Sequence, residues 1–248
     1  MSDAGQSGSM ILLRGVTKAW ESADRRFTLQ VDGLAILSGQ FYVLTGPNGT
    51  GKTTLIELLG LASQPMAGQS MLRLDGRDYD VGALWRRGKR RQLAALRACG
   101  FGYVMQMSQL LPFMSIWDNA KLVQSVAGRP DPQYIRRLFD YLGLSGRERA
   151  IPATLSPGLR QRAAVARALA ARPSFVLADE PTASLDPDGG RVVIDLLLGL
   201  ARDLGTGIVL CSHQSASYDF PDAVRIETVP EPSVEDGHYR SSVRMANA

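Results

Sequence analysis

The chain of 248 residues is poor in cysteine and lacks any long apolar run. Its two cysteines, Cys99 and Cys211, do not suggest a disulfide framework or a metal site. No run approaches the roughly 18 apolar residues of a membrane-spanning helix, and residues 1–9 lack the apolar core of a secretion signal. These absences argue against disulfide-rich and membrane-spanning classes, and we expect a soluble protein.

Charge of neither sign dominates, since the net charge is only +4. A hydrophobic content of 45% with 21% charged residues is typical of a globular protein, and the length allows one large domain with a substantial core. Basic residues cluster at 86–91, which could meet acidic headgroups or an acidic partner, or form a solvated helix or loop face. No interleaved aromatics accompany the cluster, so we expect no nucleic acid partner.

Composition divides the chain into a folded domain at 10–229 and two polar ends. Residues 1–9 and 230–248 are rich in Gly, Ser and Pro, which predicts a disordered N-terminus and a flexible C-terminal tail. Within the domain, residues 11–13, 27–31 and 71–74 favour antiparallel strands, the last with a partner after the Asp75-Gly76 turn signal.

Four short apolar runs predict buried parallel strands at 41–45, 101–105, 175–178 and 208–211. Each run stops at polar residues, and ligands of open α/β sheets bind beyond the carboxyl ends of such strands. The four strand ends can therefore converge on one site.

The intervening segment, about 108–172, predicts a helical subdomain. Apolar residues at helical spacing favour a helix over 132–143. Ser156-Pro157 and Asp186-Pro187 each combine a good N-cap with a proline at the first helical position, and so predict two helix starts.

A glycine-rich loop follows the first apolar run and leads into a helix. The glycines let successive N–H groups point at phosphate oxygens, the lysine faces the β- and γ-phosphates, and the following threonine offers a hydroxyl to Mg²⁺. A glycine turn without a ligand is the alternative. The loop, called the P-loop below, consists of Gly46, Pro47, Asn48, Gly49, Thr50, Gly51, Lys52, Thr53 and Thr54. It predicts a P-loop NTPase (RecA-like) α/β core that binds a nucleoside triphosphate.

Polar residues at the other strand ends suit hydrolysis of that nucleotide. Beside a P-loop, Asp179 suits Mg²⁺ and Glu180 suits a general base for attacking water. Gln106 could orient water or act as a Mg²⁺ ligand, and His213 could hydrogen-bond the γ-phosphate. Exposed turn carboxylates and structural strand-end caps are the alternatives.

Over about residues 11–228 the chain resembles ATP-binding-cassette (ABC) transporter ATPases. The resemblance rests on the order of P-loop, Gln106, a serine-glycine signature at 155–158, Asp179-Glu180, a Ser184-Leu185-Asp186 turn and His213. It implies ATP and Mg²⁺ as cofactors, with Lys52, Gln106, Glu180 and His213 as catalytic residues and Thr53, Gln106 and Asp179 toward the metal.

The resemblance also implies a head-to-tail homodimer with ATP between one P-loop and the partner's signature helix. Ser156 and Gly158 would then face the γ-phosphate, where the helix dipole favours negative charge. Asp186 would lie at the subunit boundary. Trp20 occupies the position where the family stacks an aromatic on adenine, with a core or rim aromatic as the alternative.

Three residues depart from the family's usual pattern. The signature Leu-Ser-Gly-Gly-Gln becomes Leu-Ser-Pro-Gly-Leu, with Pro157 and Leu159 as the changed positions. Pro157 is compatible with a helix start, whereas Leu159 cannot make the polar contacts of glutamine. Gln214 follows His213 where an acid is common. We expect ATP hydrolysis to survive, at a rate that these changes could lower.

The stretch 103–119 is similar to the branch of lipoprotein-release and MacB-type ATPases. That resemblance implies an integral membrane permease with a large extracytoplasmic domain as the partner, and a peripheral location on the cytoplasmic face of the inner membrane. The alternative function is a nucleotide-gated regulatory module on a membrane partner, with weak ATPase activity. A soluble ABC protein acting on DNA or ribosomes is disfavoured, since the sequence holds no second P-loop, zinc module or long coiled coil.

Overall fold

The structure, a computed structural model, describes residues 8–22, 25–106, 109–212, 220, 222–232 and 238–246. The chain forms two compact units. The first comprises Met1–Ser38, Gly46–Leu93 and Arg225–Ala248, and the second comprises Gly39–Thr45 and Ala94–Val224. Within the described residues, no helix combines the length and the apolarity that crossing a bilayer requires.

The first unit holds a mostly antiparallel set of strands, of which β1 and β2 are the longest. Its strands are β1 (Met10–Ser22), β2 (Arg25–Leu37), β4 (Ala67–Leu74), β5 (Arg77–Asp80), β9 (Val224–Glu231) and β10 (His238–Ala246). They are ordered β5-β4-β1-β2-β10-β9. Alternate residues of β1 and β2, including Ile11, Leu13, Leu29 and Val31, are buried, as expected for strands with one face on a core.

The hairpin of β4 and β5 confirms the turn predicted from Asp75-Gly76. Both residues have positive φ, 49° and 74°, as a two-residue turn matched to strand twist requires. The unit also contains α1 (Lys52–Leu59) and α2 (Val81–Arg86), with α2 following edge strand β5. The predicted antiparallel strands are therefore confirmed.

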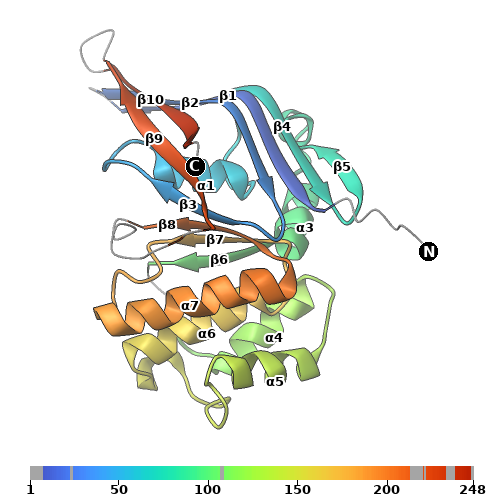
Figure 1. The fold of residues 1–248 in the computed structure, drawn as a ribbon. Helices are drawn as coiled ribbons and strands as arrows, with labels where there is room; N and C mark the ends of the chain where they lie inside the picture. The colour runs from blue at the N-terminus through green and yellow to red at the C-terminus, as the bar shows by residue number, and fades with distance from the viewer. Residues whose placement is uncertain are drawn as a thin grey trace, which may run out of the picture. The chain divides into compact units, whose positions relative to one another are not determined.

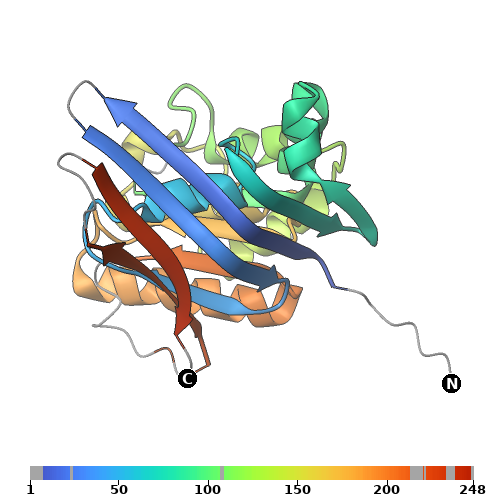
Figure 2. The same ribbon diagram turned by 90° about the horizontal axis from the view of Figure 1, so that it is seen from above.

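The C-terminal segment differs from the sequence expectation. A flexible tail was expected from residue 230, but β9 extends to Glu231 and β10 pairs in parallel with β2 and antiparallel with β9. Figure 2 shows β10, dark red, alongside blue β2. Ser241, Ser242 and Val243 are buried. The prediction is wrong for these strands, because backbone pairing orders a segment whose composition is polar. Residues 1–7 lie outside the described residues.

The second unit contains the four predicted parallel strands, in the order β3-β8-β7-β6. They are β3 (Phe41–Thr45), β6 (Phe101–Met105), β7 (Phe175–Asp179) and β8 (Gly207–Cys211). Nearly all of their residues are buried, which confirms the prediction of strands covered on both faces. Figure 1 shows α4, α5, α6 and α7 gathered beside β6.

Five helices and a 3₁₀ turn complete the described chain: α3 (Arg90–Gly100), α4 (Ile116–Val126), α5 (Pro132–Tyr141), η1 (Pro152–Thr154), α6 (Pro157–Leu169) and α7 (Pro187–Leu204). The predicted helix starts after Ser156 and Asp186 are confirmed, and α5 confirms the helix expected at 132–143. That the helices between 108 and 172 form a subdomain of their own stays a prediction.

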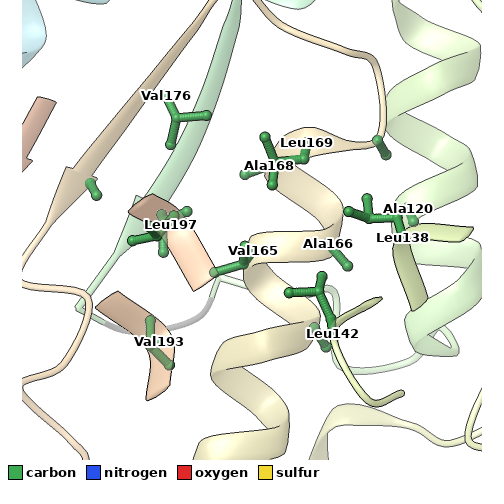
Figure 3. Packing of buried hydrophobic residues seen from close by; sticks show 14 of the residues in the cluster. Ala120, Leu138, Leu142, Val165, Ala166, Ala168, Leu169, Val176, Val193 and Leu197 are labelled. Carbon is green, nitrogen blue, oxygen red and sulfur yellow. The ribbon is translucent and has the colours of Figure 1, made fainter. Parts of the chain in front are cut away.

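Helix α6 lies at the centre of this unit's core. Figure 3 shows Val165, Ala166 and Leu169 of α6 between side chains of α7 on one side and of α4 and α5 on the other. The same helix approaches β6 closely, since a Cβ on Gly102 would lie 2.3 Å from the carbonyl oxygen of Ala168. The core therefore fixes α6, and with it the signature serine at its N-terminus.

This close approach predicts that Gly102→Ala destabilises the protein. The added methyl would collide with backbone that cannot rotate away, so we expect a loss of about 1–3 kcal/mol in the free energy of unfolding. Chemical denaturation measures it. Gly33→Ala is the control, because a Cβ there meets no atom within 4 Å. Equal stability of the Gly102→Ala variant and the wild type would contradict the packing described.

Candidate functional site

The P-loop leads from β3 into α1 through glycines that the surroundings require. A side chain at Gly46 would place its Cβ 2.2 Å from the hydroxyl of Thr228, and one at Gly51 would place it 2.8 Å from the ring of Phe27. Both glycines also have positive φ, 141° and 91°. Any other residue would therefore push this backbone away from β2 and β9.

Hydrogen bonds hold two side chains of the loop, those of Lys52 and Thr50. Lys52 is buried, and its Nζ donates to the carbonyl oxygens of Gly46 and Pro47, each at 2.8 Å. The Thr50 hydroxyl donates to the Pro47 carbonyl at 2.8 Å and lies 2.6 Å from the hydroxyl of Thr228. Phosphate oxygens could replace the two carbonyls as acceptors for the Lys52 ammonium.

The start of α1 has the form of an anion site. Gly51, the N-cap, is in the left-handed conformation, and among the described residues no side chain caps the helix. Thr53 is exposed and Thr54 half-buried in its first turn. An uncapped helix N-terminus beside a lysine attracts phosphate, and the crowded glycines form the cradle that a phosphate needs. The residues of this unit therefore fit the phosphates of a nucleoside triphosphate.

Trp20 presents a half-exposed ring on β1. Its exposed fraction is 50%, and the Nζ of Lys18 lies 4.7 Å from the ring centroid. The same Nζ donates to the carbonyl of Gln64, at 3.1 Å. The cation occupies one face of the ring and ties it to the segment after α1, which leaves a face on which a base could stack. Lys18 was not among the predicted residues, although residues two apart in a strand share a face.

In the second unit, the carboxyl ends of three strands come together. Met105 of β6 is paired with Asp179 of β7, which is paired with Cys211 of β8. Gln106 and Glu180, which follow these strands, therefore leave the sheet at one edge, as the sequence predicts. Asp179 and Glu180 are half-buried and Gln106 is exposed. His213 lies outside the described residues.

The backbone of Glu180 is strained. Its φ is +50°, which is uncommon for a residue other than glycine, and its N–H donates to the Cys211 carbonyl at 2.9 Å. The Ala183 N–H donates to the Glu180 carbonyl at 3.2 Å. Residues held in such uncommon conformations cluster at functional sites.

Ser156 caps α6, as the sequence predicts. Its backbone is extended and its hydroxyl accepts a hydrogen bond from the Leu159 N–H at 3.4 Å, while Pro157 occupies the first helical position. Arg160 donates to the carbonyls of Pro152 and Leu155, at 3.0 and 3.1 Å, and so fixes the turn before the cap. Ser156 itself is exposed, so the helix N-terminus faces outward.

The two changed signature positions have a local explanation. Pro157 suits the first turn of α6, and Leu159 packs partly buried against the core of the second unit. Leucine at this position therefore contributes to packing and cannot hydrogen-bond a polar ligand. At Gly158 a Cβ would meet no atom within 4 Å, so packing within the chain does not require a glycine there.

Asp186 is committed to a helix cap. Its Oδ1 accepts a hydrogen bond from the Gly189 N–H at 2.7 Å and so caps the N-terminus of α7. The residue remains exposed. The predicted site residues thus divide between the units. Trp20 and the P-loop belong to the first, whereas Gln106, Asp179, Glu180, the signature and Asp186 belong to the second.

Arg167 is a residue that the sequence interpretation missed. From α6 it donates to the carbonyl of Gln109 at 2.5 Å and to that of Tyr103 at 3.5 Å. Burial lowers the pKa of its guanidinium. It therefore links the helix that begins at Ser156 to the segments on either side of Gln106. An arginine inside an apolar helix face gave no separate signal.

Comparisons with known proteins agree over most of the chain. The ABC transporter family model matches residues 29–183. A lipoprotein-releasing system ATP-binding protein, LolD 1 of Rhodopirellula baltica, is 33% identical over 93% of this chain and 98% of its own length. LolD of Nitratidesulfovibrio vulgaris is 38% identical over 81% and 84%. The methionine import protein MetN of Streptomyces griseus is 35% identical over 83% of this chain and 58% of its own length.

Two solved structures of the bacterial ABC transporter cassette MJ0796 share the fold. The dimeric structure has a TM-score of 0.73 at 26% identity and covers 92% of this chain and 96% of that one. The dimeric post-hydrolysis state bound to ADP and Pi has a TM-score of 0.73 at 25% identity, with coverages of 96% and 99%. The chain belongs to the ABC transporter family, as one of its ATP-binding and ATP-hydrolysing cassettes.

Proposed function

We propose that the chain is the ATPase subunit of a bacterial inner-membrane complex of the lipoprotein-release and MacB type. Two copies close head-to-tail around ATP, and hydrolysis separates them. The observation that carries this proposal is the exposed, serine-capped N-terminus of α6. Together with the start of α1, it gives the chain two helix N-termini that can bind phosphate. The full-length similarity to lipoprotein-releasing ATPases and the dimeric cassette structures support it.

The nucleotide binds to the P-loop. Lys52 exchanges its two carbonyl acceptors for β- and γ-phosphate oxygens, and the first turn of α1 faces the same anion. Trp20 stacks on adenine, with Lys18 on its other face. The side chains of Thr53, Gln106 and Asp179 supply the hydroxyl, amide and carboxylate oxygens that Mg²⁺ prefers. When bound, Mg²⁺ would neutralise charge on the phosphates.

Glu180 acts as the general base and takes a proton from the attacking water. Glu180 directly follows β7, and the last residue of that strand, Asp179, pairs with Met105, which precedes Gln106. Gln106 positions the water, and His213 contacts the γ-phosphate. The partner subunit completes the site with the Ser156 hydroxyl, the Gly158 backbone and the start of α6, and Asp186 lies at the subunit boundary.

The second candidate function is a nucleotide-gated regulatory module with weak ATPase activity. It is favoured by Leu159, which packs against its own core where the family offers a polar side chain to the partner's nucleotide. In that case two copies would close on ATP but hydrolyse it slowly. Full ATPase activity in the presence of the permease would remove this candidate.

The permease docks in a groove on the second unit. This groove has a volume of about 300 Å³ and is lined mainly by apolar side chains of β6 and α4, with Arg97 and Arg167 at its polar part. Leu122 and Val126 of α4 are 39% and 67% exposed there. Through Arg167 the groove adjoins the segments that flank Gln106, so the occupant could sense the catalytic edge. With a permease in this groove, the proposed location of the chain is the cytoplasmic face of the membrane, as a peripheral subunit.

Glu180→Gln should abolish turnover and retain ATP binding. Loss of a general base lowers the rate by about 10²–10⁴-fold, while the amide leaves the phosphate contacts in place. Phosphate release measures turnover, and light scattering should show dimers that persist with ATP. Glu227→Gln, at an exposed strand position, is the matched control. Undiminished turnover in this variant would rule out Glu180 as the general base.

Trp20→Ala should weaken ATP binding by about tenfold or more, since stacking contributes ~1–3 kcal/mol per base. Lys18→Met should have a smaller effect in the same direction. Neither change should alter the affinity for inorganic tripolyphosphate, which has no base. Calorimetry compares both ligands, with Trp85→Phe as the control. Equal weakening of ATP and tripolyphosphate would contradict the stacking role.

Replacing Leu122 and Val126 together by Gln should abolish co-purification with the cognate permease and leave the ATPase activity of the isolated chain unchanged. Polar side chains would spoil the apolar wall of the groove without touching the nucleotide residues. Val192→Gln with Leu204→Gln, also at exposed positions on a helix, is the matched control. If the Leu122 and Val126 double variant co-purifies with the permease as well as the control variant does, this docking groove is ruled out.

A further inference from the structure

The chain carries a long stretch without acidic residues. From Val81 to Trp117 there is no Asp or Glu, and six Lys or Arg residues fall within that stretch. Five of them lie between residues 86 and 91: Arg86, Arg87, Lys89, Arg90 and Arg91. We call these five residues the basic corner. Mixed charge is typical of a soluble surface, so a run of one sign this long calls for a physical explanation.

The five residues lie at the end of α2, on the short connection that follows and at the start of α3. Gly88, with a φ of +64°, ends α2 and turns the chain. The backbone there is well bonded, since the Lys89 N–H donates to the Leu84 carbonyl at 2.9 Å and the Leu93 N–H to the Lys89 carbonyl at 3.0 Å. All five side chains are exposed. In the described part of the chain, none of the five makes an ion pair.

Stability of the two helices does not explain the basic corner. Arg86 lies in the last turn of α2, where the helix dipole favours a cation. Arg90 and Arg91, however, begin α3, where the dipole disfavours cations, and no acidic residue occupies that first turn. The five like charges also repel one another. Within the chain this arrangement is therefore unfavourable, and a negative charge from outside would relieve it.

We propose that the basic corner binds the phosphate groups of anionic lipids at the membrane surface and so holds the subunit against the bilayer. This inference rests on the proposed membrane location. Four of the five residues are arginines, which form paired hydrogen bonds with phosphate oxygens. Lipid headgroups rearrange around exposed cations and need no matching groove. The absence of aromatic residues among 86–91 disfavours single-stranded nucleic acid, which stacks its bases.

Vesicle flotation of the purified full chain tests the proposal. The probes are vesicles of phosphatidylcholine alone and vesicles in which phosphatidylglycerol replaces part of it. The wild type should bind only the anionic vesicles, and added salt should weaken that binding because screening shortens the reach of surface charge. Replacing all five residues of the basic corner by Gln should reduce binding about tenfold or more, since each cation near an anionic surface contributes separately.

A matched variant separates the basic corner from net charge. It removes the same number of exposed cations elsewhere by Gln replacement of Lys121, Arg136, Arg147, Arg149 and Arg191. This variant should keep most of the vesicle binding. Equal loss in both variants, no binding of the wild type to anionic vesicles, or tighter binding to duplex DNA than to the vesicles would overturn the proposal.

The same variants also distinguish this proposal from the proposed function. ATP turnover of the isolated chain should be unchanged in both, because neither set includes a nucleotide residue. Vesicle binding that fails while turnover and permease assembly persist would overturn the lipid contact alone. Turnover absent from the wild type would instead overturn the proposed function.

Discussion

One electrostatic constraint underlies the rest of the structure: an ammonium and a helix N-terminus are confined in a loop that admits no side chain at Gly46 or Gly51. Lys52 is buried, and its Nζ donates to the carbonyls of Gly46 and Pro47 in its own loop, each at 2.8 Å. Gly46 and Gly51 are packed against Thr228 and Phe27 so closely that a single added carbon would collide. A buried cation is costly unless an anion or strong acceptors accompany it, so this loop is prepared for phosphate.

The second unit brings its candidate site residues together by different means. Parallel strands in register bring Gln106 and the two carboxylates to one edge, where the backbone of Glu180 has a φ of +50°. The core around α6 then fixes the exposed Ser156 at that helix's N-terminus. Arg167 connects this helix to both sides of Gln106.

Much of this arrangement could be predicted from the sequence because it follows from local patterns. Short apolar runs identified the four parallel strands, and a cap followed by proline identified the starts of α6 and α7. The P-loop could be recognised from the order of its glycines, lysine and threonine between an apolar run and a helix. These features depend on neighbours in the chain, which a sequence displays directly.

The remaining features depend on residues far apart in the chain. Strand β10 was missed because pairing with β2 orders a polar segment, and composition does not record a pairing partner. Thr228, which closes against Gly46 and Thr50, comes from a strand with no motif. Glu180 has a left-handed backbone, and its N–H donates to the Cys211 carbonyl on a strand far away in the chain.

The central claim is that one copy's P-loop and another copy's signature helix share a nucleotide, and cross-linking between copies tests it most directly. One chain carries Asn48→Cys and the other Gly158→Cys, both in a Cys99→Ser, Cys211→Ala background. Position 48 is exposed and position 158 has open space for a side chain. The account predicts a disulfide between the two chains that forms with ATP and not without it. Absence of that cross-link with ATP, in the isolated chains and in the complete membrane complex, would contradict the account.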